Sequence, residues 1–463
     1  MSHVPQASPY RPERAIHELG GKFYDPVTAA DFPQTILRFR NDRWAPAVGL
    51  EGLSNEEWLR HFGRFEPLPE NLPQPLALRY HGHQFRHYNP DIGDGRGFLF
   101  AQLRDDRDRL LDLGTKGSGQ TPYSRFGDGR LTLKGGVREV LATEMLEALG
   151  AETSKTFSLI ETGEALERND EPSPTRSAVL VRLQHSHIRI GTFQRLAFFR
   201  EAENMRRLVA YCLRHYYSEE NGDDAPQRLL EHVVRATARL AASYIAAGFV
   251  HGVLNSDNIA ITAESFDYGP WRWTPYWDGA FTAAYFDHAG LYSFGRQPEA
   301  IYWDVAQLAG ALGTVTDMET LKPILEAFPL HFNTALRQAI CARLGITVKS
   351  EEEDRALITS IEEALTKRDV TIDRFFFDWR GGQLRRDRGS YEGEHFAAFR
   401  SRIQSYEAAA SAGHPYWSDE EPCSMHIEEV EAIWTRIDEA DDWSAFGAKI
   451  AAVRRMGEAM RAA

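Results

Sequence analysis

The chain has 463 residues, 43 % of them apolar and 11 % aromatic, which is typical of a globular protein with a large buried interior. A net charge of −14 without any block of Lys and Arg argues against a nucleic acid or an anionic membrane surface as a partner. The three cysteines form neither a zinc motif nor a disulfide framework, no signal-peptide core is visible, and no apolar run approaches the ~18–20 residues of a membrane span. We therefore expect a cytoplasmic protein of two lobes, with neither nucleic acid nor membrane as a partner.

The first 77 residues are rich in Pro and aromatic residues and show few periodic segments. We interpret residues 1–77 as an irregular arm that packs on the first lobe. The one helix predicted there covers Asn55–Phe62, with Ser54 as its N-cap.

Residues 78–195 predict a strand-rich lobe. Strands are expected at Phe98–Leu103, Leu110–Lys116, 156–162 and 177–183, joined by polar or glycine-rich turns. Apolar residues at helical spacing predict one helix over Val137–Leu149. Several strands with a single helix, ahead of a mainly helical remainder, are typical of the N-terminal lobe of a protein kinase.

Residues 196–463 predict a mainly helical lobe with a C-terminal extension. Apolar residues from Leu229 to Ile245 line one face of a helix that ends near Gly248. Further helices are expected at Met205–Tyr217, Ile301–Leu312, Thr334–Leu344, Arg355–Thr366 and Ile427–Ile437. The predicted fold class is therefore α+β, with a two-lobed, protein-kinase-like arrangement.

The stretch Phe249–Gly269 has the frame of a kinase catalytic loop followed by a metal-binding turn. His251 and Asn258 match H-x-x-x-x-x-x-N, and Asp267 begins D-[FY]-G, but Val253 occupies the position of the kinase base. An amide oxygen and a carboxylate are ligands that Mg²⁺ takes. Alternatively, Asn258 caps a turn and Asp267 starts an Asx-turn. The combination with His251 at kinase spacing, after a long helix, favours the metal site.

Lys116 and Glu139 have the arrangement of the kinase ion pair between a strand and a helix. A lysine that ends a strand can reach nucleotide phosphates when a helix carboxylate orients it. Lys116 ends a predicted strand, and Glu139 lies in the first turns of the predicted helix. Taken alone, Glu139 is equally explained by the helix dipole, which favours a carboxylate near the N-terminus.

Two glycine-rich turns and two arginines complete the candidates. The turns Gly93–Gly97 and Gly127–Gly129 each contain Asp-Gly-Arg and would let backbone amides approach a phosphate or an adenine, although most such turns only connect strands. Arg182 and Arg189 lie on or just after a predicted strand. Arginine there can clamp phosphate oxygens, and a structural ion pair is at least as good an explanation of these two residues alone.

The sequence resembles the selenoprotein O family of kinase-fold protein adenylyltransferases. The resemblance runs from about residue 20 to 310, and its most specific motifs are TPYSRFGDGR (121–130), HGVLNSDN (251–258) and DYGP (267–270). YHGHQF (80–85), IGDGRG (92–97) and WDVAQLA (303–309) also match.

The resemblance implies a pseudokinase-like fold that binds ATP in a reversed orientation. AMP, rather than phosphate, would be transferred to Ser, Thr or Tyr hydroxyls of proteins with release of pyrophosphate. Asp257 would be the proton acceptor, Asn258 and Asp267 would bind Mg²⁺ or Mn²⁺, and Glu139 would pair with Lys116 in the catalytic site. The implied nucleotide-binding residues are Gly93, Gly95, Arg96, Lys116, Asp128, Gly129, Arg182, Arg189 and Asp267.

The chain departs from the family pattern in places, and two other functions stay open from the sequence. Arg86 stands where the family usually has glycine, and the C-terminus lacks the family's Cys or selenocysteine, so a redox switch built on it is not implied. One alternative is a kinase-type phosphotransferase with Asp257 as base. The other is an inactive nucleotide-binding scaffold, which retained metal ligands argue against. The adenylyltransferase and the kinase-type phosphotransferase differ in which phosphate of ATP becomes attached to the protein.

Overall fold

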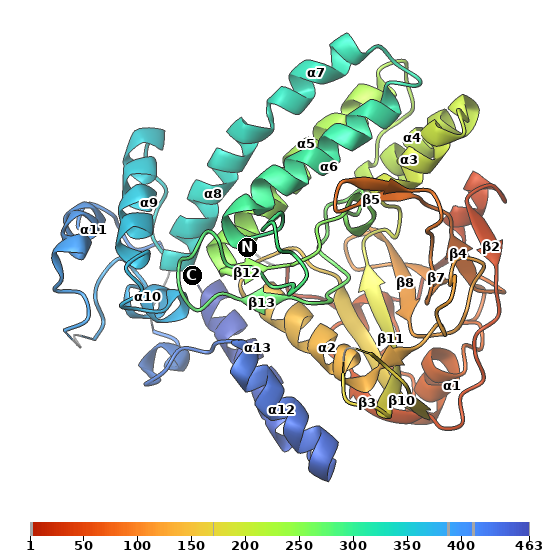
Figure 1. Cartoon of the computed structure of the whole chain (residues 1–463), viewed down its shortest axis with the longest axis horizontal. Helices are drawn as coiled ribbons and strands as arrows, with labels where there is room; N and C mark the ends of the chain where they lie inside the picture. The colour runs from red at the N-terminus through yellow and green to blue at the C-terminus, as the bar shows by residue number, and fades with distance from the viewer. Residues whose placement is uncertain (1–2, 170, 387–388, 410–412, 463) are drawn as a thin grey trace.

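The computed structural model describes residues 3–169, 171–386, 389–409 and 413–462. Strands and one long helix dominate the part before residue 190, and helices dominate the part after it. Figure 1 shows the sheet gathered on one side of the molecule, with long helices extending from the other side. The predicted α+β fold class, with a strand-rich part followed by a mainly helical part, is confirmed.

A nine-stranded sheet, antiparallel at every pairing among the described residues, forms the first lobe. Its main path is β2-β4-β7-β8-β11-β10-β3, and β1 and β9 pair with β7 and β11. The four predicted strands are present as β7, β8, β10 and β11. The strand bounds are β1 Pro12–Glu13, β2 Tyr24–Pro26, β3 Ile36–Arg40, β4 Leu76–Leu78, β7 Leu99–Arg104, β8 Leu110–Lys116, β9 Leu131–Thr132, β10 Lys155–Leu166 and β11 Thr175–Gln184.

The first 77 residues are more regular than the sequence indicates. They supply β1, β2 and β3 and begin β4, so the segment expected as an irregular arm forms both ends of the sheet. These strands have two to five residues each, which is too short for an alternating pattern to show. The predicted helix is α1 (Asn55–Gly63), closed by a capping box between Ser54 and Glu57. The domain boundaries at residues 77 and 195 stay predictions.

Helix α2 (Leu133–Ala148) packs on one face of the sheet and carries Glu139. It begins ahead of the predicted Val137, because the Thr132 hydroxyl accepts a hydrogen bond from the Gly135 amide at 3.1 Å and caps the helix. Helix α1 covers the opposite face, where Trp58 and Phe62 are buried against the strands. The sheet is therefore covered on both faces.

The helical part is built around α5 (Ala225–Ala247), which ends at Gly248 in the left-handed conformation with φ 69°. The large core that includes α2 continues through α4, α5 and α6, so the two lobes share buried apolar surface. No helix in the described part of the chain has the length and apolarity needed to cross a membrane. The other helices are α3 Ile190–Phe198, α4 Ala202–Tyr217, α6 Gln297–Leu312, α7 Met318–Glu326, α8 Phe328–Leu344, α9 Glu351–Leu365, α10 Ile372–Asp378, α11 Ala397–Ile403, α12 Ile427–Ala440 and α13 Ser444–Arg461.

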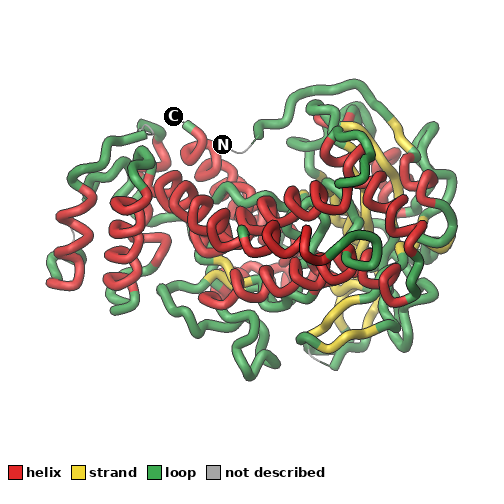
Figure 2. The backbone as a smooth tube through the Cα atoms, turned by 90° about the horizontal axis from the view of Figure 1, so that it is seen from above, coloured by secondary structure: helices red, strands yellow, loops and turns green. Residues whose placement is uncertain are grey.

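The last two helices return to the first lobe and brace α2. Arg454 of α13 forms an ion pair of 2.7 Å with the buried Glu144, and Glu431 of α12 pairs with Lys134 at 2.6 Å. Figures 1 and 2 both place the chain ends close together. Because α2 carries Glu139, these contacts fix the position of a predicted site residue.

Three short elements lead to the candidate site. A hairpin is formed by β5 (Gly82–Gln84) and β6 (His87–Asn89). After α5, β12 (Phe249–Val250) pairs with β13 (Arg272–Trp273), and the predicted catalytic loop lies between these two strands. Asp257 and Asn258 belong to the 3-10 turn Ser256–Asn258 within that loop.

Candidate active site

A cavity of about 750 Å³ lies at the ends of β7, β8 and β11 and against the catalytic loop. All nine predicted nucleotide-binding residues line it, together with Asp257. Glu139 and Asn258 are not part of its wall. The nine residues are Gly93, Gly95, Arg96, Lys116, Asp128, Gly129, Arg182, Arg189 and Asp267.

The register of β8 and β11 explains how Lys116 and Arg182 meet. Lys116 lies opposite Leu180, and Gly114 lies opposite Arg182, so the two cationic residues are diagonal neighbours on one face of the sheet. The Lys116 ammonium forms an ion pair with Glu139 of α2, as the sequence predicts. The Arg182 guanidinium lies 3.9 Å from the same carboxylate. One helix glutamate therefore faces two cationic groups.

Asp267 also faces Lys116 and Arg182. Its carboxylate lies 2.7 Å from the Lys116 ammonium and 3.5 Å from the Arg182 guanidinium. Burial opposes ionisation, but Lys116 and Arg182 outweigh it and hold the pKa of Asp267 well below its usual range. The backbone has φ 63°, a left-handed conformation that Asp tolerates better than most residues. Asp267 is thus a carboxylate kept ionised at the cavity wall.

His251 connects the catalytic loop to the turn that carries Asp267. Its Nε2 lies 2.9 Å from the carbonyl oxygen of Phe266, and its backbone amide donates to the Gln297 side chain of α6 at 3.0 Å. The side chain is fully buried, and burial lowers its pKa. These contacts suit a structural role, in which His251 fixes two loops relative to each other.

Asp257 lies buried beside the cavity, under β5. Desolvation raises its pKa to about 6, although the nearby Arg189 guanidinium lowers it. Its Oδ1 has no hydrogen-bond partner within the described residues. A β-carbon on Gly82 would lie 2.7 Å from that oxygen, so β5 approaches the carboxylate as closely as a glycine allows. A buried carboxylate with an unused oxygen at a cavity can accept a proton.

Asn258 and Asp267 could supply two of the ligands of a magnesium ion. Asn258 is half-buried, and its amide nitrogen donates to the Val253 carbonyl at 3.0 Å. Its amide oxygen and the ionised Asp267 carboxylate are hard ligands of the kind that Mg²⁺ prefers. In the described parts of the chain no three His, Cys, Asp or Glu side chains gather into a metal site. Two protein ligands, with phosphate oxygens and water completing the shell, are usual for Mg²⁺.

The first glycine-rich turn is pressed against its neighbours. A β-carbon on Gly93 would lie 2.5 Å from the ring of Tyr123, and one on Gly95 would lie 3.0 Å from the Tyr123 carbonyl oxygen. Arg96 follows, is exposed, and contributes to the low pKa of Asp267. The two glycines therefore let the backbone of the turn approach Tyr123 closely, and Arg96 lines the cavity.

Arg189 and Asp94 form a contact that the sequence does not predict. Arg189 donates to the Asp257 carbonyl oxygen at 3.0 Å and pairs with the Asp94 carboxylate at 3.2 Å. Asp94 also accepts the Leu78 amide at 2.9 Å. Arg189 thus links the glycine-rich turn to the catalytic loop. Only the repeated Asp-Gly-Arg tripeptide gave a signal for Asp94, because its partner lies far away in the chain.

The wall of the cavity contains more Lys and Arg side chains than the sequence predicts. Arg125, Arg130 and Arg168 also line it, which makes seven Lys and Arg against five Asp and Glu. Arg168 forms an ion pair of 2.8 Å with Asp128, and both residues line the cavity. In a chain of net charge −14, this local excess of positive charge suits a polyphosphate. The motif TPYSRFGDGR contained Arg125 and Arg130, whereas Arg168 had no signal.

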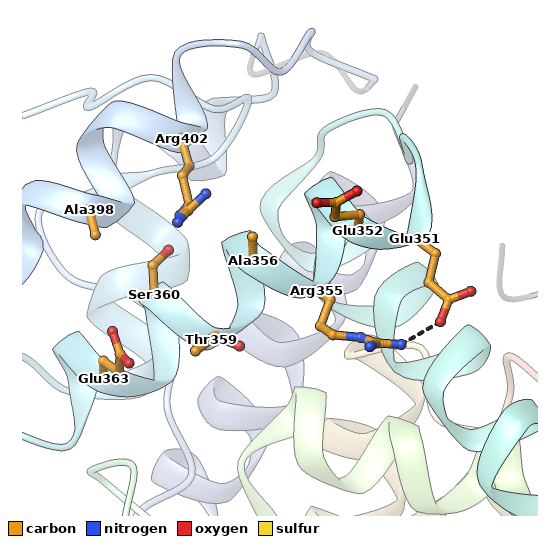
Figure 3. A pocket seen from close by; sticks show the side chains of 9 residues that line it. All are labelled: Glu351, Glu352, Arg355, Ala356, Thr359, Ser360, Glu363, Ala398 and Arg402. Atoms are coloured by element: carbon orange, nitrogen blue, oxygen red, sulfur yellow. Dashed lines mark hydrogen bonds and ion pairs between the residues drawn. The ribbon is translucent and has the colours of Figure 1, made fainter.

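A second cavity, of about 560 Å³, lies on the C-terminal helices between α9 and α11 (Figure 3). Figure 3 shows Arg355 paired with Glu351 of the same helix, and Arg402 extending from α11. Three glutamates and two arginines line it, and none of the predicted site residues does. Its charge is the opposite of what a polyphosphate requires. The cavity beside Asp257 is the candidate active site, because it holds the nine predicted nucleotide-binding residues.

The family model and the most similar sequences indicate one family. The family model "Protein adenylyltransferase SelO" matches residues 8–454. The "Protein nucleotidyltransferase YdiU" of Trichodesmium erythraeum is 46 % identical over 380 residues, covering 80 % of this chain and 79 % of the relative. The protein of the same name from Gloeobacter violaceus is 42 % identical over 470 residues, covering 96 % and 95 %. Among solved structures, a Toxoplasma gondii rhoptry antigen kinase domain matches 57 % of this chain and 81 % of its own, with 11 % identity and a TM-score of 0.28.

Proposed function

The chain belongs to the SelO family of protein adenylyltransferases, and from this premise we propose that the cavity beside Asp257 transfers AMP from ATP to Ser, Thr or Tyr hydroxyls of proteins. The single observation that carries the proposal is that nine residues separated by up to 174 positions in the chain line one cation-rich cavity. Such a cavity is suited to a triphosphate.

The cationic residues hold the phosphates that leave. In the reversed orientation, the β- and γ-phosphates face Lys116, Arg182 and Arg189, and the α-phosphate faces Asp257. Lys116 is held by Glu139, and Arg182 lies on the neighbouring strand, so their charges are in place before ATP binds. Preorganised cations stabilise the negative charge that develops on the departing pyrophosphate.

The transfer step needs a proton acceptor at the hydroxyl. The acceptor oxygen attacks the α-phosphorus and forms the new P–O bond, while the bond from the α-phosphorus to the bridging oxygen breaks and its electron pair leaves with pyrophosphate. Asp257 takes the hydroxyl proton, since its Oδ1 is unpaired among the described residues and it lies at the cavity. Val253 occupies the usual kinase position and cannot do so.

Asn258 and Asp267 would hold a divalent cation, Mg²⁺ or Mn²⁺. The ionised state of Asp267 and the amide oxygen of Asn258 support this assignment. When bound, the ion neutralises phosphate charge and orients the α-phosphate. Lys116 and Arg182, which pair with Asp267 in the structure, are then available to the phosphates of ATP.

Replacement of Arg182 tests the orientation of the nucleotide. In Arg182→Met, we expect the affinity for ATP to fall about tenfold or more, because a charge-assisted contact to phosphate contributes about 1.5–3 kcal/mol. The affinity for AMP should stay unchanged, because AMP lacks the phosphates that Arg182 contacts. Isothermal titration calorimetry measures both affinities.

Arg176→Met is the matched control. Arg176 lies on the same strand, but it pairs with Glu161 and Asp441 outside the cavity, at 2.7 Å each. We expect this variant to bind ATP and AMP as the unaltered protein does. Equal losses of AMP and ATP affinity in Arg182→Met would contradict the proposed orientation, as would an unchanged ATP affinity.

A further inference from the structure

The hairpin β5–β6, labelled at β5 in Figure 1, packs on the loop that carries the predicted base, and its Gly82 approaches the Asp257 side chain. The backbone amide of His83 donates to the Ser256 hydroxyl at 2.8 Å, and that of Phe85 donates to the Asn255 side chain at 3.0 Å. Gln84 between them lines the cavity with Asp257. The hairpin is therefore fixed, residue by residue, to the loop that carries Asp257.

The two residues at the tip of the hairpin have left-handed backbone conformations. Phe85 and Arg86 form its two-residue turn, and both have positive φ, 49° and 63°, where glycine and asparagine are usual. Arg86 is secured by an ion pair of 3.0 Å with Glu299 and lies over the Trp303 ring at 5.5 Å. Backbone strain of this kind is retained where the surroundings enforce it, often at functional sites. The Phe85 ring lies against the rings of Phe286 and Tyr292.

Phe85, Phe286 and Tyr285 form a continuous aromatic surface, which we name the acceptor platform. The ring centroids of Phe85 and Phe286 are 5.8 Å apart, and those of Phe286 and Tyr285 are 5.1 Å apart. Phe286 is 42 % exposed and Tyr285 is 80 % exposed. Exposed aromatic surface next to a site marks a place where another molecule binds.

The acceptor platform is connected to the catalytic loop through Tyr292. Phe85 packs on Tyr292 with ring centroids 5.0 Å apart, and the Tyr292 hydroxyl donates to Asn255 at 2.7 Å. The Asn255 side chain thus accepts hydrogen bonds from the Phe85 backbone amide and the Tyr292 hydroxyl, and Asn255 stands just before Ser256 and Asp257 in the loop. The acceptor platform is therefore joined to the loop that carries Asp257.

We propose that the acceptor platform binds an apolar or aromatic side chain that flanks the acceptor hydroxyl of the protein substrate. The inference rests on the proposed function, because the activity requires a protein segment at Asp257. The exposed rings of Phe286 and Tyr285 favour an apolar or aromatic occupant, because they offer ring surface for contact. The occupant is thus a short exposed segment with a hydroxyl and a nearby apolar residue.

The test uses synthetic peptides and ATP labelled at the α-phosphate. Each peptide carries one Ser, Thr or Tyr among Gly and Gln residues, with Phe placed one to three positions to either side, and its matched peptide carries Gln instead of Phe. At limiting peptide concentration we expect the best Phe peptide to be labelled about tenfold faster than its Gln match, as burial of one Phe ring allows. Equal labelling of all pairs would overturn the inference.

The variant Phe286→Ser tests whether the platform is the origin of the preference. Phe286 is chosen over Tyr285 because a phenylalanine cannot itself accept AMP. We expect the ratio of Phe to Gln labelling to fall below about threefold, in line with the loss of most of the apolar contact. Leu330→Ser, which alters a residue of 61 % exposure on α8, is the control and should keep the full ratio. A preference retained in Phe286→Ser would overturn the inference, as would a parallel loss of ATP affinity measured by calorimetry.

Two further outcomes separate this inference from the proposed function. If lysate proteins are labelled but peptides are not, lower lysate labelling by Phe286→Ser supports the platform, and equal labelling overturns it. Self-association that is lost in Phe286→Ser without any change in labelling would assign the surface to a second copy of the chain and overturn the inference. Absence of α-label from every peptide and protein would overturn the proposed function itself.

Discussion

Asp267→Asn should abolish AMP transfer while the chain remains folded. The substitution removes a carboxylate that lies 2.7 Å from Lys116 and 3.5 Å from Arg182, and with it the proposed charged ligand of the metal. Metal-ion stabilisation contributes several kcal/mol, so we expect a rate about 10³-fold lower, with less dependence on added Mg²⁺. Asparagine is chosen because it tolerates the φ of 63° at this position better than alanine does. The initial rate of α-label incorporation at several Mg²⁺ concentrations measures the effect.

The control for this substitution is Asp441→Asn. Asp441 is an Asp that also pairs with an arginine of β11, Arg176, but it lies 53 % exposed and outside the cavity. We expect its transfer rate and Mg²⁺ dependence to match those of the unaltered protein. If Asp267→Asn is folded and retains more than about a tenth of the rate, the metal assignment is wrong.

Asp257→Asn should lower the transfer rate and leave ATP binding intact. Loss of a general base costs about 10²–10⁴-fold in rate. The loop should keep its position, because Arg189 donates to the backbone carbonyl of residue 257 rather than to its side chain. Asparagine also matches the volume of aspartate under Gly82, where no additional atom fits. Rate and ATP affinity are measured on the same preparation, by α-label incorporation and by calorimetry.

The separation of rate from affinity decides whether Asp257 is the base. A normal ATP affinity with a rate at least about 10²-fold lower is the expected result. A rate within about threefold of the unaltered protein would remove Asp257 from the proton-transfer step. A loss of ATP affinity as large as the loss of rate would instead mean that Asp257 contributes to nucleotide binding.

Long periodic elements were predictable from the sequence, and short or small-residue elements were not. The apolar face of α5 and the capped start of α1 carry their signals locally, and both helices are present. The strands in the first 77 residues are too short to alternate visibly. Helix α13 was missed because it is rich in Ala and Gly: Gly457 packs against Ala148, which gives close contact without an apolar pattern.

In the candidate site, some contacts were predictable from the sequence and others were not. The pairing of Lys116 with Glu139 follows from element order, because a strand lysine and the next helix glutamate have a known partnership. The contact of Arg189 with Asp94 depends on two segments meeting in space, which no local pattern encodes. The role of Asp257 was likewise suggested by family resemblance, and only the fold reveals its burial beneath β5.

The most direct test of the central claim compares ATP labelled at the α-phosphate with ATP labelled at the γ-phosphate. The unaltered protein is incubated with Mg²⁺, lysate proteins and either nucleotide, and acid-stable protein label is counted. We predict that label enters protein from the α-phosphate and not from the γ-phosphate, and that the label is lost in Asp267→Asn. Label from the γ-phosphate alone would contradict the account and identify a kinase-type phosphotransferase.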